Sequence, residues 1–270
     1  MIKKLPISAM IVGYNEEKFL LACLKSINFC DEIFYTDLGS TDDSIKIAEQ
    51  HKAKIFYRDR ANVPSCEMVQ TELVNYTKND WVIFIDPDEV VDNDLQQQII
   101  NEFEKITADN LIGAVRVPWQ FYYKKKKLLG TVWGGSNKKY FLVNKQRFDF
   151  LPIIHYGRTL KKGYRSYDML ENEHKTNVLH HYWMNSLKVF LQKHKRYLKN
   201  EGTDNYNAGI RVGIKKVLET PFKEFYQSFI NKKGYKDGFT GFFLSTFWAY
   251  YKTHIAYDIY MLGKKKYWNY

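Results

Sequence analysis

The chain has 270 residues, of which 45% are hydrophobic and 26% charged, and its formal net charge is +11. This length and composition fit one large domain, or one domain with an appendage, and exclude a wholly disordered chain. Because no apolar run reaches the ~18–20 residues of a membrane-spanning helix and the N-terminus lacks a signal-peptide core, we expect a cytoplasmic protein.

The N-terminal part of the chain alternates strand patterns with helix patterns. In the first helix pattern, apolar residues recur at helical spacing between Phe19 and Ile27. Strands that alternate with helices predict an α/β fold with a mostly parallel central sheet covered on both faces. Strands are expected at 7–12, 32–36, 53–57, 81–85 and 112–117, and helices at 16–27, 42–50, 65–76 and 94–106.

The pattern changes further along the chain. Aromatic and polar residues alternate over 119–150, which predicts strands and hairpins. Three helices are then expected, and Pro221 should end or kink the second of them. We therefore expect one domain over 1–183 and a helical, basic and aromatic-rich C-terminal extension over 184–270. The three helices are predicted at 185–200, 208–231 and 238–263.

Two carboxylates one residue apart follow the fourth expected strand, in the segment Trp81-Val-Ile-Phe-Ile-Asp86-Pro-Asp88-Glu89. Open α/β folds bind their ligands at the carboxyl edge of the sheet, where this loop should lie. Carboxylate oxygens there could hold Mg²⁺ or Mn²⁺ together with the oxygens of a diphosphate. An acidic surface turn is the alternative, but the position after a strand favours a nucleotide-sugar site.

Polar side chains also follow the first two expected strands. Val-Gly13-Tyr14-Asn-Glu16-Glu17 opens the first helix, and Asp37-Leu-Gly39-Ser-Thr-Asp follows the second strand. A carboxylate at position 37 can accept hydrogen bonds from ribose hydroxyls or a base N–H, while Gly39 permits a tight turn. Ordinary turn chemistry could explain the polar side chains at any one of these strand ends. Polar side chains at all three strand ends are better explained by one shared ligand site.

With these motifs in this order, the sequence resembles the family 2 glycosyltransferases of the GT-A fold, specifically over residues 5–95. The tail from Tyr235 to Lys252 looks like the subgroup that contains lipopolysaccharide-core β-glucosyltransferases. The resemblance implies that the base and ribose of the donor are held by Tyr14, Glu16 and Asp37. It also implies that Asp86 approaches the ribose and the metal, and that Asp88 ligates the Mn²⁺ or Mg²⁺ that bridges the diphosphate.

The sequence departs from that subgroup in two places. Gln70 stands sixteen residues before Asp86, where the subgroup usually has Lys or Arg, so a charge placed directly on the diphosphate is not expected there. Many members carry His-Glu after an aromatic-rich stretch, whereas this chain has His155 followed by Tyr156. His155 is therefore expected to orient the donor phosphate or the acceptor.

Members of this kind invert the anomeric centre, which requires a base to take the proton of the acceptor hydroxyl. One of Asp149, Asp168 and Glu171 is the candidate base, with Glu173 a further alternative. A second group, His174, His180 and His181, precedes Tyr182-Trp183. We interpret it as a packed junction rather than a metal cluster, and we assign His181 to the donor diphosphate.

The positive charge is concentrated in the second half of the chain. Residues 1–150 hold 20 Lys and Arg against 21 Asp and Glu, whereas residues 151–270 hold 21 against 9. Such an excess attracts phosphates on anionic lipid, phosphorylated glycan or nucleic acid. The aromatics of the expected helices, such as Phe222 and Phe225, indicate either core packing with a possible homodimer interface or a helix on a membrane surface. In the second case the basic tail from Lys264 would help.

The combined expectation is a metal-dependent, inverting glycosyltransferase at the inner face of the cytoplasmic membrane. It would move a hexose or N-acetylhexosamine from a UDP-sugar to a lipooligosaccharide core or a lipid-linked capsule precursor. A peptide or protein glycosyltransferase is the alternative within the class. A sugar nucleotidyltransferase is disfavoured because Gly13-Tyr-Asn-Glu-Glu replaces a basic, glycine-rich loop. A nucleic-acid-binding module is disfavoured because three acidic strand ends would repel phosphates.

Overall fold

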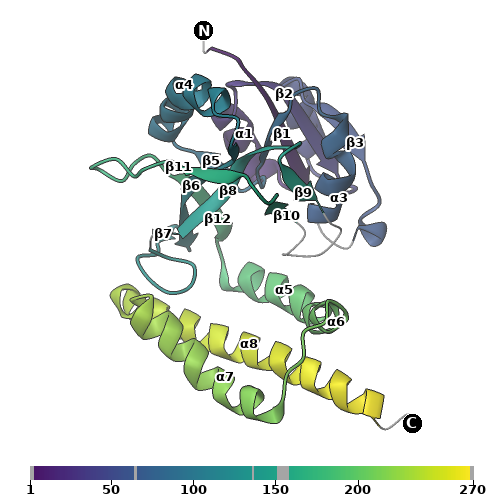
Figure 1. The fold of residues 1–270 in the computed structure, drawn as a ribbon, viewed down its shortest axis with the longest axis vertical. Coiled ribbons are helices and arrows are strands. Elements are labelled where there is room, and N and C mark those ends of the chain that lie inside the picture. The colour runs from purple at the N-terminus through teal and green to yellow at the C-terminus, as the bar shows by residue number, and fades with distance from the viewer. Residues whose placement is uncertain (1–2, 64–65, 136, 151–157, 268–270) are drawn as a thin grey trace. The chain divides into compact units, whose positions relative to one another are not determined.

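The computed structural model describes residues 3–63, 66–135, 137–150 and 158–267 (Figure 1). These residues form two compact units, each of which is described by itself. Unit 1 comprises Met1–Trp119 and Lys138–His181, and unit 2 comprises Gln120–Asn137 and Tyr182–Tyr270. The expected division into domains at 1–183 and 184–270 stays a prediction.

Unit 1 is built on the predicted α/β alternation. The strands of its first half are parallel to their neighbours, in the order β3-β2-β1-β4, and the sheet continues through β8, β6, β12 and β5. The expected strands and helices of this half are β1 (Leu5–Gly13), α1 (Glu17–Ser26), β2 (Cys30–Asp37), α2 (Ser44–Gln50), β3 (Lys54–Tyr57), α3 (Cys66–Leu73), β4 (Trp81–Phe84), α4 (Asn93–Ala108) and β6 (Ile112–Tyr123). The α/β fold class is confirmed.

Further strands complete this sheet, and two others form a second sheet. β5 (Glu89–Val91) follows the acidic loop directly and pairs with β12 (Leu179–Met184) in the antiparallel sense. The hairpin of β9 and β10 stands apart as its own sheet. The remaining strands are β7 (Lys126–Lys127), β8 (Asn137–Asn144), β9 (Phe148–Phe150), β10 (Arg158–Leu160) and β11 (Arg165–Asp168).

Alternating side chains give the sheet an apolar cluster on each face. On one face Ile83 and Ile85 pack with apolar residues of α1 and α4. On the other face Val82 and Phe84 pack with apolar residues of α3, such as Val69. β1 and β4 are buried on both faces, which is why their sequences are nearly continuous apolar runs.

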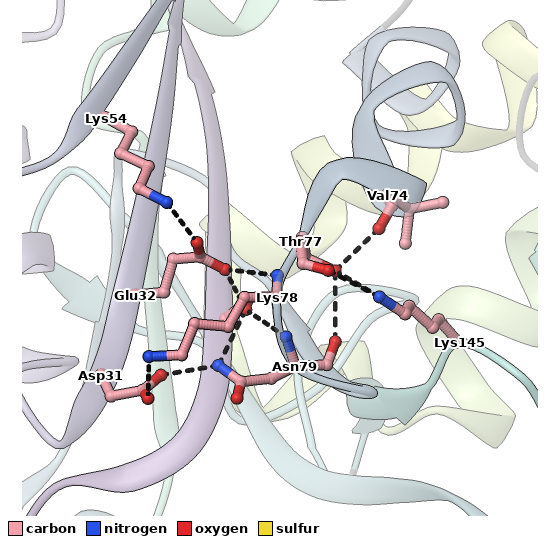
Figure 2. Close-up of polar contacts among 9 residues, drawn as sticks. Asp31, Glu32, Lys54, Val74, Thr77, Lys78, Asn79 and Lys145 are labelled. Carbon is pink, nitrogen blue, oxygen red and sulfur yellow. Dashed lines mark hydrogen bonds and ion pairs between the residues drawn. The ribbon is translucent and has the colours of Figure 1, made fainter.

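A buried polar cluster holds the start of β4 against β1 and β2 (Figure 2). The carboxylate of Glu32 accepts hydrogen bonds from the Ser8 hydroxyl at 2.5 Å, the Lys54 ammonium at 2.6 Å and the backbone N–H of Lys78 at 2.9 Å. The side-chain amide of Asn79 donates to the Ser8 hydroxyl at 3.0 Å. The cluster therefore fixes where β4 enters the sheet.

Unit 2 is helical. A buried aromatic group joins its parts: the ring of Phe190 lies 4.5 Å from that of Phe247 and 5.9 Å from that of Trp133, centroid to centroid. Pro221 was expected to end or kink its helix; it does not end it, because α7 continues five residues beyond it. The helices are α5 (Leu187–Leu198), α6 (Glu201–Asn207), α7 (Ile214–Tyr226) and α8 (Gly238–Tyr267), with a π-helical turn η3 (Gln227–Asn231) and a 3₁₀ turn η4 (Gly234–Asp237). No helix in the described part of the chain has the length and apolarity needed to span a bilayer.

Candidate active site

The sheet topology brings the three polar strand ends to one edge. β1 is parallel to both β2 and β4, and Gly13 at the end of β1 is level with Asp37 at the end of β2. The loops that begin at Tyr14, Leu38 and Ile85 therefore leave the sheet side by side at its carboxyl edge. In open α/β sheets this edge is the usual place for a ligand.

Asp37 is buried at this edge, and half of its carboxylate is already engaged. Its Oδ2 accepts the backbone N–H groups of Gly39 at 2.8 Å and Ser40 at 2.9 Å. Gly39 has a φ of +87°, a left-handed conformation that favours glycine, so the turn can wrap around the carboxylate. Oδ1 is also buried and has no hydrogen-bond partner among the described residues. A buried acceptor of this kind is suited to a ligand N–H or O–H group.

The loop after β1 is tied to the loop after β2. The backbone N–H of Asn15 donates to the Ser40 hydroxyl at 2.9 Å, and the Asn15 side-chain oxygen accepts the N–H of Thr41 at 2.8 Å. Glu16 is fixed in the same way, because its N–H donates to the Ser44 hydroxyl at 2.8 Å. The ring of Tyr14, which precedes these residues, lies under the guanidinium of Arg60 in the segment that follows β3. These bonds hold the predicted base-binding loop in a defined position.

The acidic loop after β4 meets a histidine of β12. One ligand atom from each of Asp86, Asp88 and His181 lies within 4.8 Å of the other two, and His181 Nε2 is 3.4 Å from Asp88 Oδ1. Ligands about 2.1 Å from a shared Mg²⁺ lie about 3–4 Å from one another, so small side-chain rotations would close this group around an ion. Carboxylate ligands suit Mg²⁺ and Mn²⁺, and an imidazole ligand favours a transition metal over Mg²⁺. The residues present therefore fit a divalent cation.

A buried glutamate supports that loop from behind. Glu89 Oε2 accepts the backbone N–H of Asp86 at 2.9 Å and the Lys139 ammonium at 2.5 Å, while Oε1 accepts the indole N–H of Trp119 at 2.8 Å. Burial raises the pKa of Glu89, and the charge of Lys139 opposes that rise. The Trp119 ring also stacks on the ring of His181 at 5.2 Å between centroids. Glu89 thus positions the loop that carries Asp86, and Trp119 positions the ring of His181.

The three candidate bases lie in different surroundings. Asp168 ends β11 and is paired with Arg116 at 2.6 Å and Lys138 at 2.8 Å. Burial acts to raise the pKa of Asp168, but the bonds from these two cations outweigh it and hold the pKa below its usual value. Glu171 lies 3.8 Å from Lys175, and Asp149 lies in β9 opposite Thr159. None of the three is in the group formed by Asp86, Asp88 and His181. His155 lies outside the described residues.

Sequence reasoning missed several residues of this site. His181 was expected at the diphosphate and not at the metal. The pairing of β5 with β12 sets His181 opposite Glu89, and no local sequence pattern predicts that pairing. Lys139 and Trp119 were not singled out either. The alternation of side chains along β8 and β6 could have placed them on one sheet face, but their contact with Glu89 depends on the order of strands. His180 lies 3.3 Å from Asp92, away from the metal group.

Comparison with known proteins agrees with this geometry. A family model described as glycosyl transferase family 2 matches residues 8–217. An uncharacterized glycosyltransferase of Rickettsia felis is 24% identical over 253 residues, which cover 90% of this chain and 86% of the relative. A lipopolysaccharide core biosynthesis glycosyltransferase, LpsC of Rhizobium meliloti, is 24% identical over 267 residues, covering 96% and 94%.

Among solved structures, glucosyl-3-phosphoglycerate synthase of Mycobacterium tuberculosis, in complex with Mg²⁺ and UDP, matches at 23% identity and a TM-score of 0.33. That alignment spans 43% of each chain. The family match covers most of the chain, and metal dependence and inversion at the anomeric carbon are consistent with that family. The chain belongs to the family 2 glycosyltransferases.

Proposed function

We propose that this glycosyltransferase moves a hexose or N-acetylhexosamine from a UDP-sugar to a lipooligosaccharide core or a lipid-linked capsule precursor. The similarity to LpsC over nearly the whole chain favours a cell-surface glycan as acceptor. The observation that carries the proposal is the meeting of Asp86, Asp88 and His181 at the edge where Asp37 offers a buried carboxylate oxygen. Such a site can bind a nucleoside diphosphate through a cation at one end and the base or ribose at the other.

Within this site the donor would contact residues of three loops. Asp37 Oδ1 would accept a base N–H or a ribose hydroxyl, and Tyr14 and Glu16 would border the base. Asp88 and His181 would hold Mn²⁺ or Mg²⁺, and Asp86 would approach both the ion and the ribose. The ion would supply positive charge for the departing diphosphate.

The reaction also needs a base on the acceptor side. An acceptor hydroxyl oxygen attacks C1 while the bond from C1 to the diphosphate oxygen breaks, and the hydroxyl proton passes to a carboxylate. Asp168 is held ionised by Arg116 and Lys138, which oppose proton uptake. Its ion pairs therefore make Asp149 and Glu171 the stronger candidates.

The donor site is tested by thermal shift with UDP, GDP and dTDP, each with and without Mn²⁺. We expect metal-dependent stabilisation by UDP, about 2.7 kcal/mol at a ligand concentration 100 times the Kd. Asp88→Asn should remove the metal dependence and the transfer activity while the fold is retained. The matched control is Asp80→Asn, at the start of β4 and away from the metal group. Absence of a shift with every nucleotide would argue decisively against a transferase.

We also propose that unit 2 attaches the enzyme to an anionic membrane surface. Unit 2 holds 20 Lys and Arg against 6 Asp and Glu, a net charge of +14, whereas unit 1 holds 21 against 24, a net charge of −3. The acceptors proposed above are carried on lipids, so a basic unit would bring the enzyme to them. Each basic residue close to an anionic surface contributes about 1 kcal/mol of attraction.

An apolar stripe on α7 gives this surface a membrane-inserting edge. Ile214, Leu218, Phe222 and Tyr226 follow one another at intervals of four residues, and all are exposed, Phe222 to 77%. Phe239 at the start of α8 is 83% exposed. The opposite side of α7 is buried at Val217 and Thr220. Lysines flank the stripe at Lys215, Lys216 and Lys223. This combination of apolar and basic side chains is typical of helices that lie in the membrane interface.

Two other aromatics of this region pack inside unit 2 against an aromatic of α8. Phe225 and Phe229 stack on each other at 5.3 Å, and both contact Phe242, at 5.8 Å and 6.0 Å between ring centroids. Core packing thus accounts for Phe225 and Phe229, and the exposed side of α7 would be the side that binds the proposed membrane surface.

Flotation with vesicles separates a membrane from a second copy of the chain as the partner. Binding to vesicles that contain phosphatidylglycerol should exceed binding to phosphatidylcholine vesicles and fall with salt. The double variant Leu218→Ser/Phe222→Ser should weaken it at least tenfold, since burying one such side chain contributes ~1.5–3 kcal/mol. Tyr76→Ser, an exposed aromatic of unit 1, is the matched control. Unchanged flotation of the double variant, or a wild-type dimer that it converts to a monomer, would refute the proposal.

A further inference from the structure

A guanidinium lies beside the strand that leads to the candidate metal site. Arg158, the first residue of β10, has its Cζ 4.9 Å from the ring centroid of Phe84. Phe84 is the last residue of β4 and stands two positions before Asp86. Because Ile85 packs in the cluster on the other face of the sheet, the alternation of side chains continues past the end of β4. Asp86 therefore follows Phe84 on the face where Arg158 lies.

A buried amide orients this guanidinium. Arg158 Nη1 donates to the side-chain oxygen of Gln70 at 2.8 Å, and Gln70 is only 3% exposed in α3. A neutral amide accepts one N–H and leaves the positive charge of the guanidinium uncompensated. No carboxylate in the described part of the chain forms an ion pair with Arg158. Three other guanidiniums of unit 1 do have carboxylate partners: Arg58 pairs with Glu72, Arg116 with Asp168 and Arg165 with Asp109. Of the others described, Arg60 lies over the ring of Tyr14, and Arg147 donates to backbone carbonyls.

We infer that Arg158 binds the diphosphate of the donor and supplies the cation that α3 lacks at Gln70. This inference rests on the proposed transferase function. A partly buried charge without a counter-ion is costly unless an anion completes its surroundings. A guanidinium presents paired N–H donors that match phosphate oxygens, and it stays charged at any working pH.

The role of Arg158 in the reaction follows from where charge develops. When the bond from C1 to the diphosphate oxygen breaks, the electron pair stays on that oxygen, and the acceptor proton passes to the base. Donors aimed at the oxygen before the reaction stabilise the transition state without reorganisation. Arg158 would share this work with the cation held by Asp88 and His181. Gln70 would be a positioning residue, because it acts only through Arg158.

The alternative is an arginine that merely attaches β10 to α3 through Gln70 and Phe84. Titration calorimetry with UDP, UMP and uridine in the presence of Mn²⁺ separates the two roles. Arg158→Gln should weaken UDP binding about tenfold or more, weaken UMP binding less, and leave uridine binding unchanged. Arg158→Lys should retain part of the UDP affinity. Arg165→Ala, which removes an exposed and carboxylate-paired guanidinium, is the matched control and should bind UDP as the wild type does.

A rescue variant makes the test sharper. Since Gln70 touches Arg158, a lysine at position 70 would place an ammonium at nearly the same point. The double variant Arg158→Gln/Gln70→Lys should therefore recover UDP affinity lost in Arg158→Gln. Melting temperatures of all variants identify any that fail to fold, in which case Arg158→Lys decides the outcome.

The outcomes also separate this inference from the proposed function. A wild-type protein that binds no UDP would overturn the transferase proposal and the role of Arg158 together. A wild-type protein that binds UDP, with an Arg158→Gln variant that binds it equally well, would overturn the inference alone. An equal loss of UDP and uridine affinity would likewise indicate a structural arginine.

Discussion

Removal of the charge of Glu32 should destabilise unit 1 by an amount that depends on pH. The Glu32 carboxylate is buried and accepts hydrogen bonds from Ser8, Lys54 and the N–H of Lys78 (Figure 2). In Glu32→Gln the amide oxygen can still accept from Ser8 and Lys78, whereas its NH₂ group must face Lys54. Hydrogen bonds to charged groups contribute about 1.5–3 kcal/mol and neutral ones about 1 kcal/mol. Because Lys54 is largely exposed and can be solvated instead, we expect a loss of about 1–2 kcal/mol.

The dependence on pH follows from the pKa of Glu32. Burial acts to raise this pKa, but the hydrogen bonds from Lys54, Ser8 and Lys78 outweigh it, so the pKa is below its usual value. The stabilisation is therefore complete above the pKa of the unfolded chain, near 4.5, and is lost as the pH falls through the folded value. The difference between wild type and Glu32→Gln should be largest at neutral pH and shrink under acidic conditions.

Urea unfolding of both proteins, followed by tryptophan fluorescence between pH 3 and pH 7, measures this difference. Lys54→Met is the control, since it removes only the exposed partner and should cost less than 1 kcal/mol. UDP affinity should not change in either variant, because the Glu32 cluster lies at the start of β4, away from the acidic loop. Its member Ser8 pairs with Val82, four residues before Asp86. A Glu32→Gln variant as stable as wild type at pH 7, or a difference that does not vary with pH, would refute the reasoning.

Two further substitutions test the support of the metal loop and the interior of unit 2. Lys139→Met leaves the buried Glu89 without its cation, and the loss of about 3 kcal/mol in urea unfolding should be smaller at acidic pH, where Glu89 can be protonated. Gly130→Ala would bring a Cβ to 2.1 Å from the carbonyl oxygen of Lys233 and should lower the melting temperature by several degrees. Gly213→Ala has no atom within 4 Å of the new Cβ and should be tolerated; equal effects of the two glycine changes would contradict this packing.

The fold of unit 1 was predictable because its signals are local. The apolar runs that end at Gly13, Asp37 and Phe84 each give a buried strand, and a parallel arrangement follows from the helices between them. In unit 2 the sequence predicted no helix over 201–207, where the structure has α6, and it began a helix at Ala208, whereas α7 begins at Ile214. The structure ends α6 before Gly209, whose φ of +92° is incompatible with a right-handed helix.

The site was predictable only where its residues follow a strand directly. Asp37, Asp86 and Asp88 could be named because parallel strands deliver their C-terminal ends to one edge. His181 was assigned to the donor diphosphate but not to the metal, and Arg158 was not singled out, since each reaches its neighbours through pairing between segments far apart in the sequence. Arginine is also common in ordinary surfaces, so composition alone gave no reason to select Arg158.

The charges of the site favour a cation that binds before the donor. Asp86, Asp88 and Glu89 lie within four consecutive residues, and Lys139 is paired with Glu89. An incoming diphosphate would therefore approach a group of closely spaced carboxylates. Like charges this close raise each other's free energy, and an added diphosphate would raise it further. A divalent cation reverses the sign of the field at that point and turns the repulsion into attraction. UDP should therefore bind weakly without Mn²⁺, and Arg158 alone should not restore its affinity, because one positive charge does not offset two carboxylates.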